Sequence, residues 1–195
     1  MTETGHGQVA SAVADALIRH PAALLVVGRP EEESIPDELI STTALDLLRA
    51  TSQPMLVVPH HPPTAALPHR ILLAIDAEPF TLNESNEAVR HFFSAPSTQL
   101  TVIHISPDAG EAATSAAFEA ITHLSLIADL PQLQTSTLVN PVPADGILQA
   151  AATGKFDLIV LIARPRSFLG ELFHHSVTAE MLLHSPLPVL VLPAR

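Results

Sequence analysis

The chain has 195 residues, of which 47% are hydrophobic, and this is enough apolar material for the core of one domain and part of another. Nine lysines and arginines stand against 20 acidic residues, and the net charge of −11 argues against binding to nucleic acid or to an anionic membrane surface. Cysteine is absent, which excludes disulfides and thiolate metal sites, and no apolar run reaches the roughly 18 residues of a membrane span.

Residues 1–59 alternate between helical and strand patterns. The patterns predict a helix at Val9–Arg19, a strand at 23–28, a helix across residues 39–47 and a strand within "QPMLVVP" at 53–59. The N-terminal sequence "MTETGHGQ" lacks the basic and apolar regions of a secretory signal, so we expect a cytoplasmic protein.

A proline-rich stretch at residues 60–68 indicates a linker, and a complete domain is predicted at 69–195. Strands are expected at 70–76, 99–106, 133–139, 157–163 and 188–192, and helices at 81–93, 111–128, 144–153 and 171–184. The first of these helices carries a capping-box spacing in "TLNE" at 81–84. Because crossovers between parallel strands are right-handed, this alternation predicts a parallel sheet with helices on both faces.

The region before the linker resembles the end of that domain. A shift of 134 residues places 23–59 on 157–193 without a gap, although only seven of the 37 positions are identical. The apolar phase of the helix also repeats, because Leu39, Thr43 and Leu47 fall on Phe173, Val177 and Met181. We therefore expect a partial copy, helix-strand-helix-strand, although any strand-helix-strand unit would align in a similar way.

Three features together resemble the universal stress protein family. They are an aliphatic strand ending in Asp76, a strand carrying "VIHIS", and the C-terminal unit "HSVTAEMLLHSPLPVLVLP", which is similar to the family's "GSVAERVLRHAPCPVLVV". The resemblance covers residues 69–195 as one domain and about 5–59 as the back half of another. It implies a five-stranded parallel sheet of order 3-2-1-4-5 in a tandem protein whose first domain is incomplete.

Members of this family that bind nucleotides carry the signature G-x2-G-x9-G-[S/T], whose glycines let backbone atoms approach a triphosphate. The corresponding positions of the complete domain are Ile162, Pro165, His175 and Ser176. Those of the partial copy are Gly28, Glu31, Ser41 and Thr42. A β-branched side chain, a missing N–H group and an imidazole replace the three glycines, so we expect a degenerate ATP-binding motif.

Five residues remain as candidates for a vestigial nucleotide site. The resemblance implies that Asp76 contacts the nucleoside and that the backbone of Ile105 contacts the base. Arg164 and Arg166 could replace the lost glycine amides by pairing with phosphate oxygens, and Ser176 keeps a hydroxyl donor. The alternative is that both arginines are solvated loop residues and that the site no longer holds a ligand.

The 11 histidines do not form a convincing metal site. The pairs His60–His61 and His174–His175 are adjacent in sequence, so their side chains point in different directions. Glu171 with His175 and Glu180 with His184 have i, i+4 spacing, but two ligands without a third make a weak site. His104 is expected to be structural. Because no nucleophile elbow or phosphate-binding loop motif is present, we expect neither a metal site nor an enzyme.

The partial copy also suggests where the protein makes contacts. In a complete family domain the fourth strand pairs with the first, but the strand Leu24–Val27 has no first strand beside it. Met55–Val58 could still pair with Val189–Leu192. Because exposed strands template association, residues 20–30 are expected at a homodimer seam or against another protein.

Two functions follow from these patterns. The first is a non-catalytic stress-response or regulatory module that acts through dimerisation or protein partners and needs no cofactor. The alternative is a sensor that binds ATP, AMP or another small anion through Asp76, Arg164, Arg166 and Ser176.

Overall fold

The computed structural model describes residues 9–29, 37–62, 67–76, 78–82, 86, 89–93, 97–108, 115, 119, 133–164 and 176–194; at 37–42, 91 and 92 it describes the backbone only. The first part of the described chain contains α1 (Val9–Arg19), β1 (Leu25–Gly28), α2 (Asp37–Ala50) and β2 (Met55–Val58). The second contains β3 (Arg70–Ile75), α3 (Arg90–Phe93), β4 (Gln99–Ser106), β5 (Leu133–Val139), α5 (Pro143–Gly154), β6 (Leu158–Ala163), α6 (Val177–His184) and β7 (Val189–Pro193).

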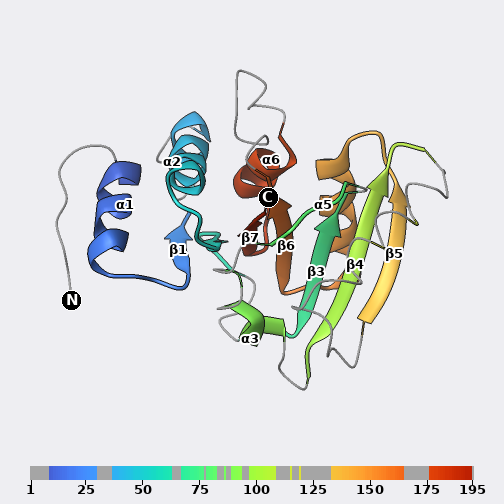
Figure 1. The fold of residues 1–195 in the computed structure, drawn as a ribbon. Coiled ribbons are helices and arrows are strands. Elements are labelled where there is room, and N and C mark those ends of the chain that lie inside the picture. Colours follow the sequence, from blue (N-terminus) through green and yellow to red (C-terminus); the bar gives the residue numbers. More distant parts are fainter. Residues whose placement is uncertain are drawn as a thin grey trace.

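One sheet of seven strands runs through the molecule in the order β1-β2-β7-β6-β3-β4-β5 (Figure 1). Neighbouring strands are parallel except at the junction of β2 with β7. The sheet is therefore larger than the five strands predicted for residues 69–195, because β1 and β2 extend it past β7. Within residues 69–195 the strands lie in the order β5-β4-β3-β6-β7. Numbered from the first strand of that region, this order is 3-2-1-4-5.

The junction between β2 and β7 joins the N-terminal region of the chain to its last strand. Met55 pairs with Val191 and Val57 pairs with Val189, in antiparallel register. This confirms the expected pairing of residues 55–58 with 189–192. Both strands are aliphatic and mostly buried, so the junction lies inside the sheet and forms no free edge.

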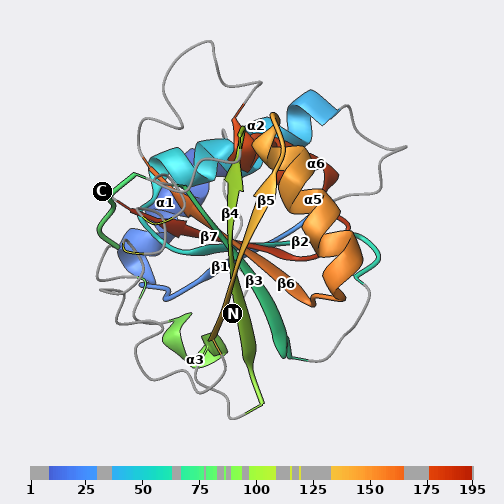
Figure 2. The same cartoon turned by 90° about the vertical axis from the view of Figure 1, so that its right-hand side faces the viewer.

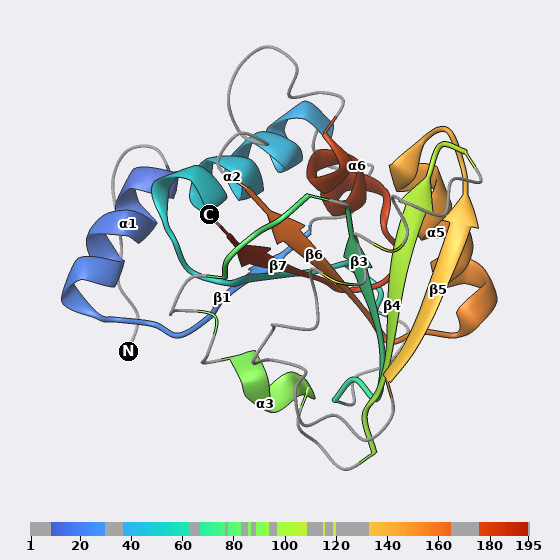
Figure 3. The same ribbon diagram turned by 45° about the vertical axis from the view of Figure 1, so that its right-hand side comes forward.

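The helices divide between the two faces of the sheet. In Figure 3, α1, α2, α5 and α6 lie along one face, and α3 lies on the other. Alternate residues of the central strand β3 serve the two cores: Leu72 and Ala74 join the cluster under α2, α5 and α6, whereas Ile71, Leu73 and Ile75 join the cluster that includes Phe93 of α3. A strand covered on both faces needs apolar residues at every position, and β3 reads "ILLAI" after its first residue.

The connection between β3 and β4 differs from its prediction. A helix was expected to begin at Thr81, but Leu82 instead forms an isolated antiparallel bridge with Ala194. The buried side chain of Asn86 then donates from Nδ2 to the carbonyl oxygen of Pro193, 2.7 Å away. These two contacts tie the segment to the end of β7, and the described α-helix begins only at Arg90.

Two other predicted helices are only partly covered by the described residues. Of the helix expected at 111–128, Ser115 and Glu119 are described, and both are helical. Of the helix expected at 171–184, residues 171–175 lie outside the described part, and α6 begins at Val177.

Candidate functional site

The candidate site lies where the order of the strands reverses. From β3 the chain crosses to β4 on one side, and from β6 it crosses to β7 on the other side. In open α/β sheets such a reversal leaves a crevice beyond the carboxyl ends of the two central strands. Asp76 follows β3 and Arg164 follows β6, and these strands are parallel neighbours, so both side chains reach the same crevice.

A two-pronged ion pair joins these residues. Arg164 Nη1 donates to Asp76 Oδ2, and Arg164 Nη2 donates to Asp76 Oδ1 at 2.7 Å. The arginine side chain is only 9% exposed, whereas the aspartate side chain is 54% exposed. The guanidinium fork matches the two carboxylate oxygens, which is the geometry that arginine forms best. The charge of Arg164 is thus balanced within the protein.

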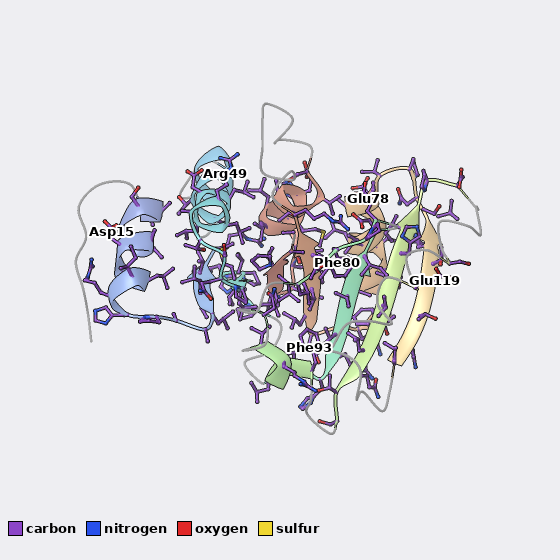
Figure 4. The ribbon with its side chains drawn as sticks, viewed as in Figure 1. Asp15, Arg49, Glu78, Phe80, Phe93 and Glu119 are labelled. Carbon is purple, nitrogen blue, oxygen red and sulfur yellow. The ribbon has the colours of Figure 1, made fainter. Side chains whose placement is uncertain are left out.

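Two neighbours that the sequence analysis did not identify complete the surroundings of Arg164. Its Nη2 also donates to the carbonyl oxygen of Glu78 at 2.6 Å, and its guanidinium lies 5.7 Å from the centre of the Phe80 ring. The backbone N–H of Glu78 in turn donates to Asp76 Oδ1 at 3.1 Å. Figure 4 labels Glu78 and Phe80 near the carboxyl end of β3. The segment after Asp76 therefore folds back over the arginine.

A cavity of about 350 Å³ adjoins the ion pair. It lies between the ends of β3, β4 and β6 and the first turns of α5 and α6. Its lining is mostly aliphatic, with polar groups at a few positions, and consists of Ala74, Ile75, Asp76, Ile105, Pro143, Ile147, Leu161, Ile162, Arg164, Ser176, Val177 and Thr178. A pocket of this kind, apolar with a few convergent polar groups, is typical of a small-molecule site.

Four of the five predicted site residues therefore line the cavity. Asp76, Ile105, Arg164 and Ser176 all line it, whereas Arg166 lies outside the described residues. The sequence left two alternatives for Arg164, a phosphate partner or a solvated loop residue. The structure instead buries its side chain and pairs it with Asp76. The two residues follow adjacent parallel strands with opposite charges, and this was the signal from which their pairing could have been found.

Ser176 has a structural task at the mouth of the cavity. It is the N-cap of α6, and its Oγ accepts a hydrogen bond from the backbone N–H of Ala179 at 3.0 Å. An N-cap side chain satisfies one of the N–H groups that the first turn of a helix leaves without a partner. The cap uses the oxygen as an acceptor, so the hydroxyl proton can still be donated to a ligand.

Close packing of α5 on β4 forms another wall of the cavity. A Cβ atom added at Gly146 would lie 2.7 Å from Ile105 Cγ2 and 3.1 Å from Ile105 Cδ1. Glycine at this position therefore lets the helix approach the strand closely. Ile105 lies at the end of β4 and is buried, and its side chain occupies the space that a larger residue at 146 would need.

The glycine-signature positions are partly within the described residues. Ile162 lines the cavity at the position of the first signature glycine, whereas Pro165 and His175 lie outside the described part. In the N-terminal region, Gly28 has no atom within 4 Å of the place where a Cβ would sit. The only described glycine of the two signatures thus lies in open space, away from the cavity.

The histidines within the described residues make local contacts. His104 is buried, and one of its ring nitrogens, Nδ1, lies 3.2 Å from the carbonyl oxygen of Ile75, which fits a role in holding β3 and β4 together. His184 Nε2 lies 3.4 Å from the Glu180 carboxylate on α6. Within the described ranges, no three histidine or acidic side chains gather in the way a metal ion requires.

The fold and the crevice define a class: an α/β protein with an open, mostly parallel sheet and a mostly aliphatic cavity at the reversal of its strand order. Comparison with known proteins gives the family. The model of the universal stress protein family matches residues 68–193, and the chain belongs to that family. No curated protein matches the chain closely enough to add a function.

Solved structures share this fold at low sequence identity. A universal stress protein from Archaeoglobus fulgidus DSM 4304 is 17% identical, with a TM-score of 0.60, over 93% of this chain and 64% of that one. A putative universal stress protein from Pseudomonas aeruginosa UCBPP-PA14 is 18% identical, with a TM-score of 0.60, over 97% and 69%. The cytoplasmic domain of a prokaryotic cation chloride cotransporter is 14% identical, with a TM-score of 0.57, over 94% and 70%.

These likenesses extend over nearly all of this chain but not over all of the other proteins. The chain spans about two thirds of the length of the solved structures it matches. Among the helices of the described residues, none has the length and apolar character needed to cross a bilayer.

Proposed function

We propose that this protein is a non-catalytic regulatory module of the stress response, located in the cytoplasm, whose nucleotide site is degenerate and which acts through contacts with other polypeptides. One observation carries the first part of this proposal. Asp76, the acid that the family resemblance assigns to the nucleoside, is held on both of its oxygens by Arg164.

A nucleoside that used Asp76 in the family manner would compete with Arg164 for the carboxylate oxygens. Asp76 Oδ1 accepts from Arg164 Nη2 and from the backbone N–H of Glu78, and Oδ2 accepts from Arg164 Nη1. Displacement would leave the guanidinium buried without its counter-charge, and an unpaired buried charge is costly. The free energy lost in this way would subtract from the affinity for the nucleoside.

The other end of a bound ATP would meet further obstacles. Ile162 lines the cavity where the signature requires a glycine, and its β-branched side chain occupies the space near the backbone. The sequence adds Pro165, which has no N–H to donate, and His175 at the third glycine position. These substitutions support a site that has lost its cradle for phosphates, and the proposed module has no cofactor.

The second part of the proposal concerns the N-terminal region. We interpret α1, β1, α2 and β2 as a partial copy of α5, β6, α6 and β7, so that the protein is a tandem with an incomplete first domain. Residues 1–59 would then be the copy, 60–68 the linker and 69–195 the complete domain. The strand at Leu24–Val27 would be the site of contact, either in a homodimer or with a different protein.

A second candidate function rests on the chemistry of Arg164. None of the described residues lies within hydrogen-bond distance of its buried Nε, although Nη1 and Nη2 are both bonded. Arg164 and Ser176 both line the cavity, and the hydroxyl proton of Ser176 is a donor there. The hydroxyl and the cationic side chain favour a small ligand with acceptor atoms, such as AMP, ATP or another anion, and Arg166 would add charge to such a site.

Titration calorimetry and thermal unfolding with ATP, with AMP and with each plus Mg²⁺ separate the two candidates. The regulatory module predicts no saturable heat and no rise in Tm with either nucleotide. A ligand at 100 times its Kd would stabilise the protein by about 2.7 kcal/mol, which is easily measured. Saturable binding that disappears in both Asp76→Ala and Arg164→Ala, and persists in the exposed control Arg49→Ala, would establish the sensor instead.

A third measurement addresses catalysis separately. Incubation of the protein with ATP and Mg²⁺, followed by assay for ADP, should give no product above the rate without protein. Product whose formation is lost in Asp76→Ala would contradict the non-catalytic assignment, whatever the result of the binding titrations.

A further inference from the structure

The first four elements of the chain repeat the geometry of the last four. The 134-residue shift carries the pair Leu25–Met55 onto Ile159–Val189, and each of the four pairs between β1 and β2 falls on a pair between β6 and β7. The helices agree as well. The described buried residues of α2 and those of α6 occupy equivalent positions: Ala44, Leu45, Leu47 and Leu48 on α2, and Thr178, Ala179, Met181 and Leu182 on α6.

The two sets of elements differ in what lies beside their first strand, β6 or β1. The outer side of β6 pairs with β3 in parallel register, with Ile71 beside Leu158 and Leu73 beside Val160. The corresponding side of β1 has no strand beside it among the described residues, since β1 stands at one end of the sheet (Figure 1). Among the strands that the structure describes, β1 thus has no counterpart of β3 beside it.

The helix α1 shows the same deficit independently. Its twin α5 packs on β4 and β5 and buries Ala144, Gly146, Ile147 and Ala151. The helix α1 covers the equivalent range, packs on α2, and has no buried residue. Figure 2, which views the molecule from its β5 side, shows α5 to the right of the strands β4 and β5. On the side of α1 that corresponds to this contact, the described part of the chain places no strand.

The free edge of β1 offers unpaired backbone groups. The N–H of Leu25 donates to the carbonyl oxygen of Pro54 and that of Arg29 to the carbonyl oxygen of Val58, so the odd-numbered residues of the strand face β2. Backbone groups alternate between the two edges of a strand, and those of Val26 and Gly28 therefore face outward. The side chain of Val26 is also 63% exposed, more than that of Leu133 or Val139 in the strand β5.

The opposite edge of the sheet has a different composition. The strand β5 reads "LQTSTLV", and its middle residues are polar, whereas β1 reads "LVVG". Proteins protect an exposed edge with polar or charged residues, because an aliphatic edge recruits further strands. By this criterion β5 is built as a terminal edge and β1 is built to be covered.

We propose that the free edge of β1, together with the uncovered side of α1, binds an aliphatic β-strand of another polypeptide segment in parallel orientation. The register follows from β3: the residues of the incoming strand that correspond to Ile71 and Leu73 lie beside Leu24 and Val26. A second copy of this chain does not supply such a strand, because its own β3 is held between β4 and β6. The occupant is therefore a segment with a strand that is not yet paired.

The incoming strand is aliphatic because of its surroundings. Val26 and Leu24 on one face, and the half-buried Leu25 and Val27 on the other, present apolar side chains to a neighbour. The segment that follows it would pass beneath α1 and cover residues equivalent to the buried ones of α5. The inference rests on the contact proposed above for Leu24–Val27 and names its occupant. It does not involve Asp76 or Arg164, so a test of it is independent of the nucleotide site.

The probe for a test is the synthetic peptide HRILLAID, which copies residues 69–76. Hydrogen exchange of the full chain is followed by NMR with and without an excess of the peptide. At saturation, exchange of the Val26 and Gly28 amides should slow by roughly tenfold or more, because both become hydrogen-bonded. A nitroxide at the C-terminus of the peptide should broaden the Gly28 amide more than the Leu24 amide, and one at the N-terminus should do the reverse.

Two proline variants give a matched comparison. Val26→Pro removes an N–H that faces the free edge, and proline is tolerated at such positions of edge strands. Val139→Pro is the control: Asn140 N–H donates to the carbonyl oxygen of Ser106, so Val139 N–H also faces outward, but from the β5 edge. The first variant should abolish the peptide's effect and the second should leave it unchanged.

Other outcomes would overturn the proposal. They are unchanged exchange at Val26 and Gly28 with excess peptide, equal protection in Val26→Pro, and broadening that shows antiparallel pairing. Sedimentation of the chain alone as a dimer that Val26→Pro converts to a monomer would assign the edge to a second copy instead. If Val26→Pro does not fold, Val26→Lys keeps the N–H group and should still weaken peptide binding at least tenfold, through the charge placed in an apolar contact.

Discussion

Leu56 and Leu190 lie opposite each other where β2 meets β7, and the shift of 134 residues carries one onto the other. Their neighbours are exchanged in the same way, because Met55 pairs with Val191 and Val57 with Val189. The junction therefore has local twofold symmetry about this leucine pair. Two identical chains that pair their last strands about a twofold axis would form the same register. Here a single chain makes that contact with itself.

The leucine pair should contribute unequally to stability. Leu190 is almost fully buried, whereas Leu56 is partly exposed. We expect Leu190→Ala to lower the free energy of unfolding by about 2 to 5 kcal/mol and Leu56→Ala by less, because fewer contacts are lost. Urea unfolding measures both, with the exposed Leu67→Ala as a control near zero. Equal losses in the two variants would contradict the burial difference.

The ion pair beside the cavity should respond asymmetrically to removal of its members. Asp76→Asn leaves a buried guanidinium without a counter-charge and should cost about 1 to 3 kcal/mol of unfolding free energy. Arg164→Met leaves a carboxylate that water can hydrate, since Asp76 is half-exposed, and should cost less. Urea unfolding of both variants tests this order. A larger loss for Arg164→Met would show that the contact with Phe80 outweighs the charges.

The approach of α5 to β4 should depend on Gly146. Alanine there gains helix propensity of about 1 kcal/mol, but its Cβ would lie 2.7 Å from Ile105 Cγ2, and overpacking costs about 1 to 3 kcal/mol. We expect Gly146→Ala to be net destabilising on its own. Combined with Ile105→Ala it should show favourable coupling of at least about 0.5 kcal/mol in a double-mutant cycle. Gly28→Ala, which meets nothing within 4 Å, is the control.

The cap of α6 gives a prediction at the mouth of the cavity. Ser176→Ala removes the acceptor for the Ala179 N–H and should lower the free energy of unfolding by about 1 kcal/mol. Ser176→Asp keeps an acceptor and places a negative charge at the positive end of the helix, so it should restore the loss. Thermal unfolding distinguishes the variants. Equal stability of the alanine and aspartate proteins would show that the cap contributes nothing.

Much of the fold could be predicted because its strands are strongly patterned. The strand at 70–76 is apolar at successive positions, as a central strand must be, and its match to β3 is close. The pairing of 55–58 with 189–192 was also predicted, from the resemblance to a family whose last strands commonly pair across a dimer or tandem interface. The prediction that a helix begins at Thr81 was wrong. The local capping signal was weaker than the contacts of Leu82 and Asn86 with the end of β7.

The site was less predictable than the fold. The family resemblance grouped Asp76, Ile105, Arg164 and Ser176, and the structure places all four in the lining of one cavity, because each lies at or beside the end of an element that meets the same edge of the sheet. They did not reveal that Arg164 pairs with Asp76, since the choice between an internal carboxylate and an external phosphate depends on side-chain geometry. The contribution of Phe80 and of the Glu78 carbonyl depended on how a short loop folds back.

The pairing of β2 with β7 also has a consequence for how the chain folds as it is made. Leu56 must wait for Leu190 to be synthesised, and at 5 to 20 residues per second this takes roughly 7 to 27 s. During that interval β2 has no partner on its β7 side. Contacts between residues so distant in sequence form slowly even in the finished chain, because closing a long loop costs entropy. The N-terminal elements can therefore join the rest of the sheet only after β7 has been made, although they leave the ribosome first.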